Sequence, residues 1–198
     1  MKHFLRRLAN LSPPALALAG VMVLPAACSL ADGGDDETTD PTSEREIVLM
    51  TDPPRDADGQ LIPVEKTEAG WRDELTDQEF RILRESGTER AGTGRYLDHK
   101  DQGIYACAGC GLALFESETK FDSGTGWPSF YRPIGADHVA SIRDETHGMV
   151  RVENRCARCN GHLGHVFKDG PKPTGERYCM NGYALRFVPA DRADPPGE

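Results

Sequence analysis

Two Cys-x-x-Cys pairs most constrain what this chain can fold into: Cys107 with Cys110, and Cys156 with Cys159. Two residues between thiolates allow a tight turn to aim both sulfurs at one ion, and the turn residue after each pair supplies the backbone freedom this needs. Four thiolates complete a closed tetrahedral site with no open position for water or substrate. The sequence therefore predicts one structural Zn²⁺ per chain, which clips two remote turns together across the 45 residues between the pairs.

Two other interpretations of these pairs stay open. Each pair could close on itself as a disulfide in an oxidising compartment, although six cysteines in 198 residues are too few for a disulfide-stapled mini-protein. Either pair could instead be a thioredoxin-like redox motif, but neither sits in a recognisable strand–helix setting.

The N-terminal residues 1–27 have the composition of an export signal. Lys2, Arg6 and Arg7 precede an apolar stretch that is too short for the ~20 residues that span a bilayer. Residues 24–28 resemble the lipobox of bacterial lipoproteins, with Pro25 where a small or hydroxyl residue is usual, and this resemblance implies lipidation of Cys28. We therefore expect an exported, membrane-anchored lipoprotein on the extracytoplasmic side, with plain secretion and a retained membrane helix as alternatives. An unmodified Cys28 in the intact mass of the exported protein would contradict lipidation.

Charged residues are distributed unevenly over the remainder of the chain. Without the signal, 20 basic residues face 32 acidic ones, a net charge of −12, which argues against a nucleic-acid groove. Ten acids and two bases fall in residues 31–60, which predicts a solvated spacer, although the apolar island 47–50 could dock on the domain. The expected organisation is a lipidated cysteine with an acidic disordered linker over residues 28–66, a folded domain over 67–190 and a polar tail over 191–198.

Local patterns predict one helix and several strands. Residues 71–87 are expected to form a helix with its lead-in, begun by a capping box of Thr76 and Glu79 and ended by Gly87. Alternation over 138–144 and 149–153 predicts a pair of core strands, with inward side chains at Ile142, Val150 and Val152 and no chemistry assigned. Residues 183–189 alternate as a closing core strand.

One domain cysteine, Cys179, belongs to neither pair, so its thiol is free for chemistry. It follows a segment with His162 and His165, which could donate a proton near neutral pH or could be unremarkable surface imidazoles. Trp127, between a glycine and a proline, is a candidate apolar binding wall, although an ordinary buried loop has the same composition.

These motifs together resemble the B-type methionine sulfoxide reductases, which act on the R epimer. The match extends from Trp71 to about Pro189, roughly 60% of the chain. It is carried in order by residues 71–76, 80–90, 94–96 and 103–105, by both cysteine pairs, and by residues 119–130, 160–167 and 177–182. The sequence departs from the family at Thr125, where many relatives have a resolving cysteine, and at Gly182, where a serine is more usual.

The resemblance implies a fold and a set of roles. The fold is mainly β, with two small antiparallel sheets packed together, one or two N-terminal helices and a Cys₄ zinc site. The Cys179 thiolate attacks the sulfoxide sulfur while His162 and His165 protonate the departing oxygen, which Asn181 and a water help to hold. On the substrate side, Trp127 contacts the S-methyl group, Arg177 favours the thiolate and Asp169 orients a histidine.

Two functions from different classes compete on this sequence. The first is a monomeric repair enzyme that returns methionine-R-sulfoxide in oxidised proteins to methionine. Because Thr125 replaces the resolving cysteine, the sulfenic acid at Cys179 would be reduced by a thioredoxin-like protein or another external thiol. The second is a zinc-stabilised binding module without catalysis, which would have no use for a free thiol beside two histidines.

Overall fold

The computed structural model describes residues 47–193, so the export signal, Cys28 and residues 194–198 lie outside the described residues. Two antiparallel sheets dominate this part of the chain, with the orders β2-β1-β9 and β3-β4-β8-β7-β6-β5. The small sheet contains β1 (Gly103–Cys107), β2 (Ala113–Glu116) and β9 (Leu185–Pro189). The large sheet contains β3 (Lys120–Phe121), β4 (Ser129–Phe130), β5 (Val139–Asp144), β6 (Arg151–Cys156), β7 (His162–Phe167) and β8 (Arg177–Met180). The expected mainly β architecture is confirmed.

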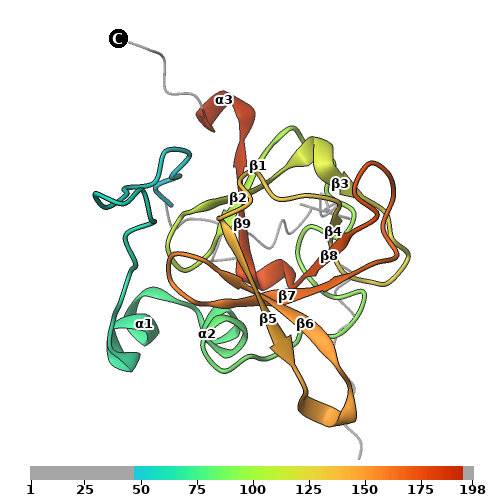
Figure 1. Ribbon diagram of the computed structural model, residues 1–198, viewed down its shortest axis with the longest axis horizontal. Coiled ribbons are helices and arrows are strands. Elements are labelled where there is room, and N and C mark those ends of the chain that lie inside the picture. The colour runs from blue at the N-terminus through green and yellow to red at the C-terminus, as the bar shows by residue number, and fades with distance from the viewer. Residues whose placement is uncertain (1–46, 194–198) are drawn as a thin grey trace, which may run out of the picture. The chain divides into compact units, whose positions relative to one another are not determined.

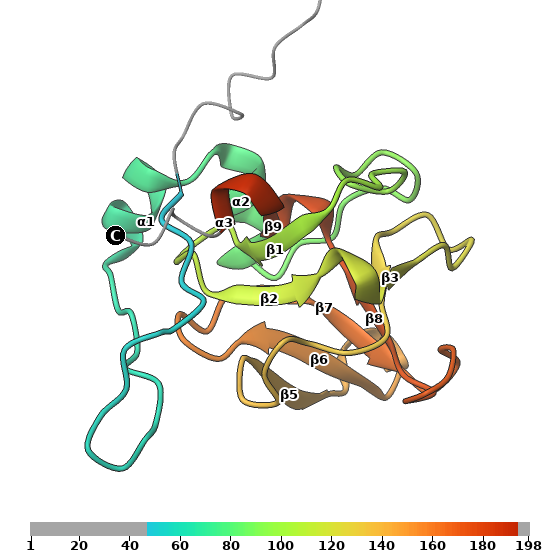
Figure 2. The ribbon, with the colours of Figure 1, turned by 90° about the horizontal axis from the view of Figure 1, so that it is seen from above.

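The core lies between the two sheets, which Figure 2 shows as stacked layers. Phe115 from the small sheet stacks on Phe130 from the large sheet with ring centroids 4.3 Å apart, and Tyr105 meets the same ring edge-on at 5.0 Å. Leu163 and Met180 come from β7 and β8 and are fully buried in the same cluster. Met180 fixes the core-facing side of β8. In β7 the register shifts between the pairs Asn154–Gly164 and Arg155–His162, so Leu163 can face the core while the His162 and His165 rings lie together on the other side.

Two short helices precede the sheets, α1 (Glu68–Glu74) and α2 (Asp77–Leu83), and a third, α3 (Ala190–Ala193), follows them. The predicted capping box is confirmed, with the Thr76 hydroxyl and the Glu79 carboxylate each accepting the other residue's backbone N–H. The expected single helix is wrong in extent, because its lead-in is already helical and α2 ends at Leu83, before Gly87. Thr76 has the extended backbone that an N-cap requires (φ −69°, ψ 162°), so the cap that starts α2 also separates it from α1.

Two parts of the expected linker contact the domain: the apolar island 47–50, whose docking the sequence left open, and residues 61–64. Met50 forms a parallel bridge with Leu112, and its N–H donates to the Gly111 carbonyl at 2.9 Å. Leu61 and Val64 pack against the core. Apolar burial of this kind helps to offset the entropy cost of ordering the backbone of this segment. Between residues 47 and 193, no helix has both the length and the apolar character needed to cross a bilayer.

The β5–β6 hairpin is paired as predicted, with the 3₁₀ turn Thr146–Gly148 at its tip, but three of its side chains are not inward. Ile142, Val150 and Val152 are 42%, 66% and 39% exposed, which contradicts their assignment to the core. The reason is the position of β5 as the last strand of the large sheet. Figure 1 shows the hairpin extending past the small sheet, so no second layer covers these three apolar side chains near its tip.

Candidate active site and metal centre

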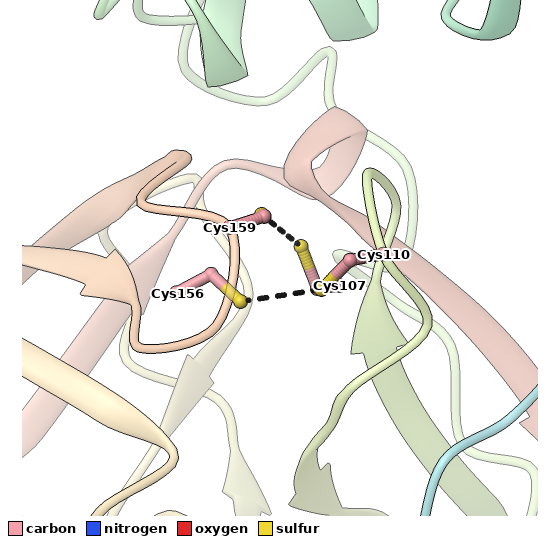
Figure 3. A group of neighbouring side chains, drawn as sticks. All are labelled: Cys107, Cys110, Cys156 and Cys159. Atoms are coloured by element: carbon pink, nitrogen blue, oxygen red, sulfur yellow. Dashed lines mark hydrogen bonds between the residues drawn. The ribbon is translucent and has the colours of Figure 1, made fainter. Parts of the chain in front are cut away.

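The four paired cysteines converge on one point between two turns (Figure 3). The sulfurs of Cys107 and Cys159 are 3.6 Å apart, those of Cys110 and Cys156 are 3.5 Å apart, and all four lie within 4.8 Å of one another. These separations are far beyond a disulfide bond of about 2.05 Å and close to the ~3.8 Å edge of a tetrahedron whose Zn–S bonds are about 2.3 Å. The five described cysteines are free, so the donor set fits a structural Zn²⁺.

The turns that carry these cysteines are built alike. In the first, Gly111 N–H donates to the Cys107 carbonyl at 2.9 Å, and in the second Asn160 N–H donates to the Cys156 carbonyl at the same distance. Gly111 and Asn160 both have positive φ, 75° and 57°, which explains the turn residue after each pair. The first turn follows β1 and the second leads directly into β7, so a metal here fixes where β7 begins.

Cys179 lies in the middle of three adjacent strands. The sheet register places it opposite His165 on β7 and opposite Ser129 on β4. Met180, its neighbour in sequence, faces the core, so the Cys179 side chain projects to the other side of the sheet. Gly164 allows β7 to approach closely, because a Cβ at this position would collide with the Cys179 carbonyl.

A pocket of about 130 Å³ opens beside the Cys179 thiol. Its walls combine apolar rings, hydrogen-bonding groups and one cation, as a site for a small, partly polar group requires. The lining residues are Thr88, Trp127, Arg151, Gly164, His165, Phe167, Cys179, Met180 and Asn181.

Two opposing effects act on the Cys179 thiol. Burial is the larger, and it raises the pKa of the thiol above its ordinary value. The positive charge of Arg177 and the hydroxyls of Thr125 and Ser129 act in the other direction by favouring the thiolate. The Thr125 hydroxyl oxygen lies 3.9 Å from the Cys179 sulfur, so a hydroxyl stands where the sulfur of a resolving cysteine would otherwise be.

The two histidines are held at different depths by two carboxylates. His165 lines the pocket, and its Nε2 lies 2.8 Å from an Asp144 carboxylate oxygen that also accepts from Arg151 at 2.8 Å. His162 lies behind it, fully covered, with Nδ1 2.6 Å from the Glu153 carboxylate. Burial lowers the pKa of His162, and the Glu153 charge opposes that shift. The two imidazole rings are 5.6 Å apart and meet edge to face, so His165 can act on a substrate while His162 supports it.

Comparison with known proteins places this constellation in a family. The SelR domain matches residues 75–189. A relative from Thiobacillus denitrificans, named peptide methionine sulfoxide reductase MsrB, is 61% identical over 126 residues, which are 64% of this chain and 96% of the relative. MsrB proteins from a Synechococcus strain and from Pseudomonas aeruginosa are 57% and 52% identical, over 63% and 66% of this chain and 92% and 99% of their own lengths. This chain belongs to the MsrB family.

Within this MsrB domain, the sequence-predicted site residues fall into four groups, the last of which is the pair of Arg177 and Asp169. Trp127, His165, Cys179 and Asn181 line one pocket. His162 stands behind His165, as described above. The four paired cysteines, which could hold a metal ion, form a separate cluster, and none of them is among the residues that line the pocket.

Arg177 and Asp169 form a pair of their own at the edge of the MsrB site. Both Asp169 carboxylate oxygens accept from the Arg177 guanidinium at 2.9 Å, and that guanidinium lies 4.4 Å from the centre of the Phe167 ring. The expectation that Asp169 orients a histidine is therefore corrected, because Asp144 and Glu153 have that position. Asp169 instead holds the cation that faces Cys179.

The residue after Asn181 also differs from the family pattern for a visible reason. A Cβ at Gly182 would collide with the backbone of Arg95, so a serine would need this loop to shift. The Gly182 N–H donates to the Glu89 carboxylate at 2.6 Å. In this MsrB chain the turn after the nucleophile is therefore held through its backbone.

Sequence reasoning missed the residues that support the histidines. Asp144 and Glu153 lie in strands that had been assigned only to the core, and Arg151 between them lines the pocket. The available sequence signal was an acidic residue, Asp144 or Glu153, in each of two strand segments that were otherwise predicted to belong to the core. It could not be used without knowing that β6 and β7 are neighbours.

Replacing Arg177 by methionine is expected to make Cys179 less reactive. The guanidinium lowers the pKa of a thiol whose pKa burial already raises, so its removal raises that pKa further and reduces the thiolate fraction at neutral pH. The rate of iodoacetamide alkylation at pH 7.5 should fall by about tenfold, and the alkylation profile should move to higher pH. The matched control is Arg177→Lys, which keeps the charge and should retain most of the rate. An unchanged profile in Arg177→Met would contradict this role.

Proposed function

We propose that this protein reduces methionine-R-sulfoxide in proteins to methionine. The observation that carries the proposal is the pocket in which the Cys179 thiol, the His165 imidazole and the Trp127 ring face the same small volume. A methionine sulfoxide has an electrophilic sulfur for the thiol, a basic oxygen for the imidazole and a methyl group for the indole ring. The relatives named peptide methionine sulfoxide reductase support the same reaction.

The proposed reaction balances with one proton and one pair of electrons. The Cys179 thiolate attacks the sulfoxide sulfur, the S–O bond breaks and the oxygen passes to the Cys179 sulfur. His165, held by Asp144, supplies the proton that the oxygen needs. The products are methionine, which has been reduced, and a Cys179 sulfenic acid, which has been oxidised by the same two electrons.

Epimer selectivity follows in this proposal from an asymmetric pocket. Trp127 provides an apolar wall for the S-methyl group, and His165 and Asn181 provide the polar side for oxygen. Exchange of methyl and oxygen at sulfur would place the oxygen against the indole. We therefore propose that the R epimer alone presents its sulfur to Cys179 with the oxygen near His165.

Regeneration of Cys179 in this proposal depends on an external thiol. Among the described residues, the other four cysteines belong to the metal site, and Thr125 faces Cys179 instead of a resolving cysteine. A thioredoxin-like protein or another thiol would form a mixed disulfide with Cys179 or reduce its sulfenic acid directly. The signal-like N-terminus and Cys28 support a place for this exchange on the extracytoplasmic side of a membrane.

The deciding experiment offers the separate R and S epimers of a methionine sulfoxide peptide with excess dithiol. The R epimer should be consumed at least about 100-fold faster, which corresponds to a difference of about 2.7 kcal/mol between the two transition states. Without dithiol, one methionine should form per chain, and Cys179 should become reactive towards dimedone. The matched variant Thr125→Cys should trap that sulfenic acid as a disulfide instead. Equal turnover of both epimers would exclude the proposal, and no turnover of either would favour a binding module.

A further inference from the structure

Glu89 is a buried carboxylate that the reaction described above does not use. It is 5% exposed and lies between α2 and β1, directly after Thr88, which lines the pocket. Its two carboxylate oxygens accept the backbone N–H groups of Gly182 at 2.6 Å and Tyr183 at 3.2 Å. These donors follow Cys179 by three and four residues, so the carboxylate anchors the turn that begins just after the nucleophile strand.

The backbone of Glu89 makes two further contacts with the pocket wall. Its N–H donates to the Asn181 side-chain oxygen at 3.1 Å, and its carbonyl accepts the Trp127 indole N–H at 3.2 Å. The Asn181 amide nitrogen in turn donates to the Leu163 carbonyl at 3.1 Å, so both ends of this amide are held by backbone. One residue therefore links the indole on the methyl side of the pocket to the amide on its polar side.

Burying the Glu89 carboxylate costs desolvation free energy, which suggests that the position of this group matters. Burial raises the pKa of Glu89, and the hydrogen bonds from the Gly182 and Tyr183 N–H groups offset only part of that rise. The loop is also shaped around the group, because a Cβ at Gly94 would collide with the carboxylate. If the side chain were lost, the Glu89 backbone would no longer be fixed against the turn, and its bonds to Trp127 and Asn181 would loosen together.

We propose that Glu89 is a positioning residue, which holds Trp127 and Asn181 at a fixed separation across the Cys179 pocket and so sets substrate affinity and epimer selectivity. The inference rests on the proposed sulfoxide reduction. It assigns no proton transfer to Glu89, because the carboxylate is occupied by backbone donors and is not among the pocket-lining residues. The intrinsic reactivity of the Cys179 thiol is therefore independent of it.

The test compares Glu89→Gln and Glu89→Ala with Glu79→Gln. Glu79 is a matched control, because it is also a buried carboxylate but pairs with Arg186 and Arg95, caps α2 and is not among the residues that line the pocket. Glutamine can accept one of the two N–H groups at Glu89, whereas alanine accepts neither, so the effects should be graded. For the R epimer, KM should rise by about tenfold in Glu89→Gln and by more in Glu89→Ala, as the loss of a charged hydrogen bond predicts. The selectivity for the R epimer over the S epimer should fall in both variants. Alkylation of Cys179 should stay within about twofold of the parent.

A second readout does not need turnover. The chain has two tryptophans, so a Trp71→Phe background leaves Trp127 as the only tryptophan, which can be excited selectively over the tyrosines. Acrylamide quenching of Trp127 should increase in both Glu89 variants and stay at the parent level in Glu79→Gln. If KM and quenching in Glu89→Gln and Glu89→Ala match those of Glu79→Gln, or if Cys179 alkylation falls in step with activity, the positioning role is wrong. If the parent itself reduces neither epimer, the proposed function fails, while the quenching result still decides whether Glu89 holds Trp127.

Discussion

The Cys179→Ser variant is expected to lose methionine sulfoxide reduction almost completely, with kcat lower by at least about 10³-fold, as removal of a nucleophile does in other enzymes. A serine hydroxyl does not ionise near neutral pH, and the Arg177 guanidinium and the Thr125 and Ser129 hydroxyls that favour the thiolate cannot remove its proton. Turnover of the R epimer with excess dithiol, followed by chromatography of the peptide, measures the loss.

The same variant should keep its fold, which separates chemistry from stability. Cys179 is only partly buried and is not one of the four clustered cysteines that could hold a metal ion. Thermal unfolding and zinc content should therefore match the parent. Activity that survives in Cys179→Ser would show that another group carries the reaction, and it would remove the basis for both the sulfenic acid and the external thiol.

Loss of the metal is expected to have the second large effect, this time on stability. Elemental analysis of the purified protein should find one zinc per chain, bound by the four clustered cysteines. A cross-link across the 45 residues between Cys110 and Cys156 restricts the unfolded chain by about 4 kcal/mol on a loop-entropy estimate. Cys156→Ser, or removal of zinc by a chelator, should lower the unfolding free energy by at least that amount, measured by urea denaturation.

Activity should be lost with the metal because β7 begins directly after the second cysteine pair and carries both His162 and His165. Cys179→Ser and Cys156→Ser form a complementary pair, the first inactive and stable, the second unstable. Destabilisation by a reducing agent without any effect of a chelator would instead support two disulfides. A parent protein that contains no zinc would also exclude the site.

Features that depend on residues close in sequence were predictable from the sequence. Two thiolates separated by two residues can share an ion whatever the remainder of the fold does, so Cys107, Cys110, Cys156 and Cys159 were identified by spacing alone. The capping box of Thr76 and Glu79 is equally local, and it formed as predicted. Cys179 was singled out by elimination. Trp127 and the two histidines were candidates by residue type, and the family resemblance supplied their roles.

Only the tertiary structure decided which groups support these residues. Alternation of apolar and polar residues identifies the two faces of a strand but not what covers them. Ile142 and Val152 were therefore predicted to face the core, although both side chains are exposed. Asp144 meets His165 across 21 residues, and Glu89 meets Gly182 across 93. Contacts of this range are fixed by sheet order, register and close packing between strands, and the physical reason they escape sequence analysis is that no local spacing or propensity encodes them.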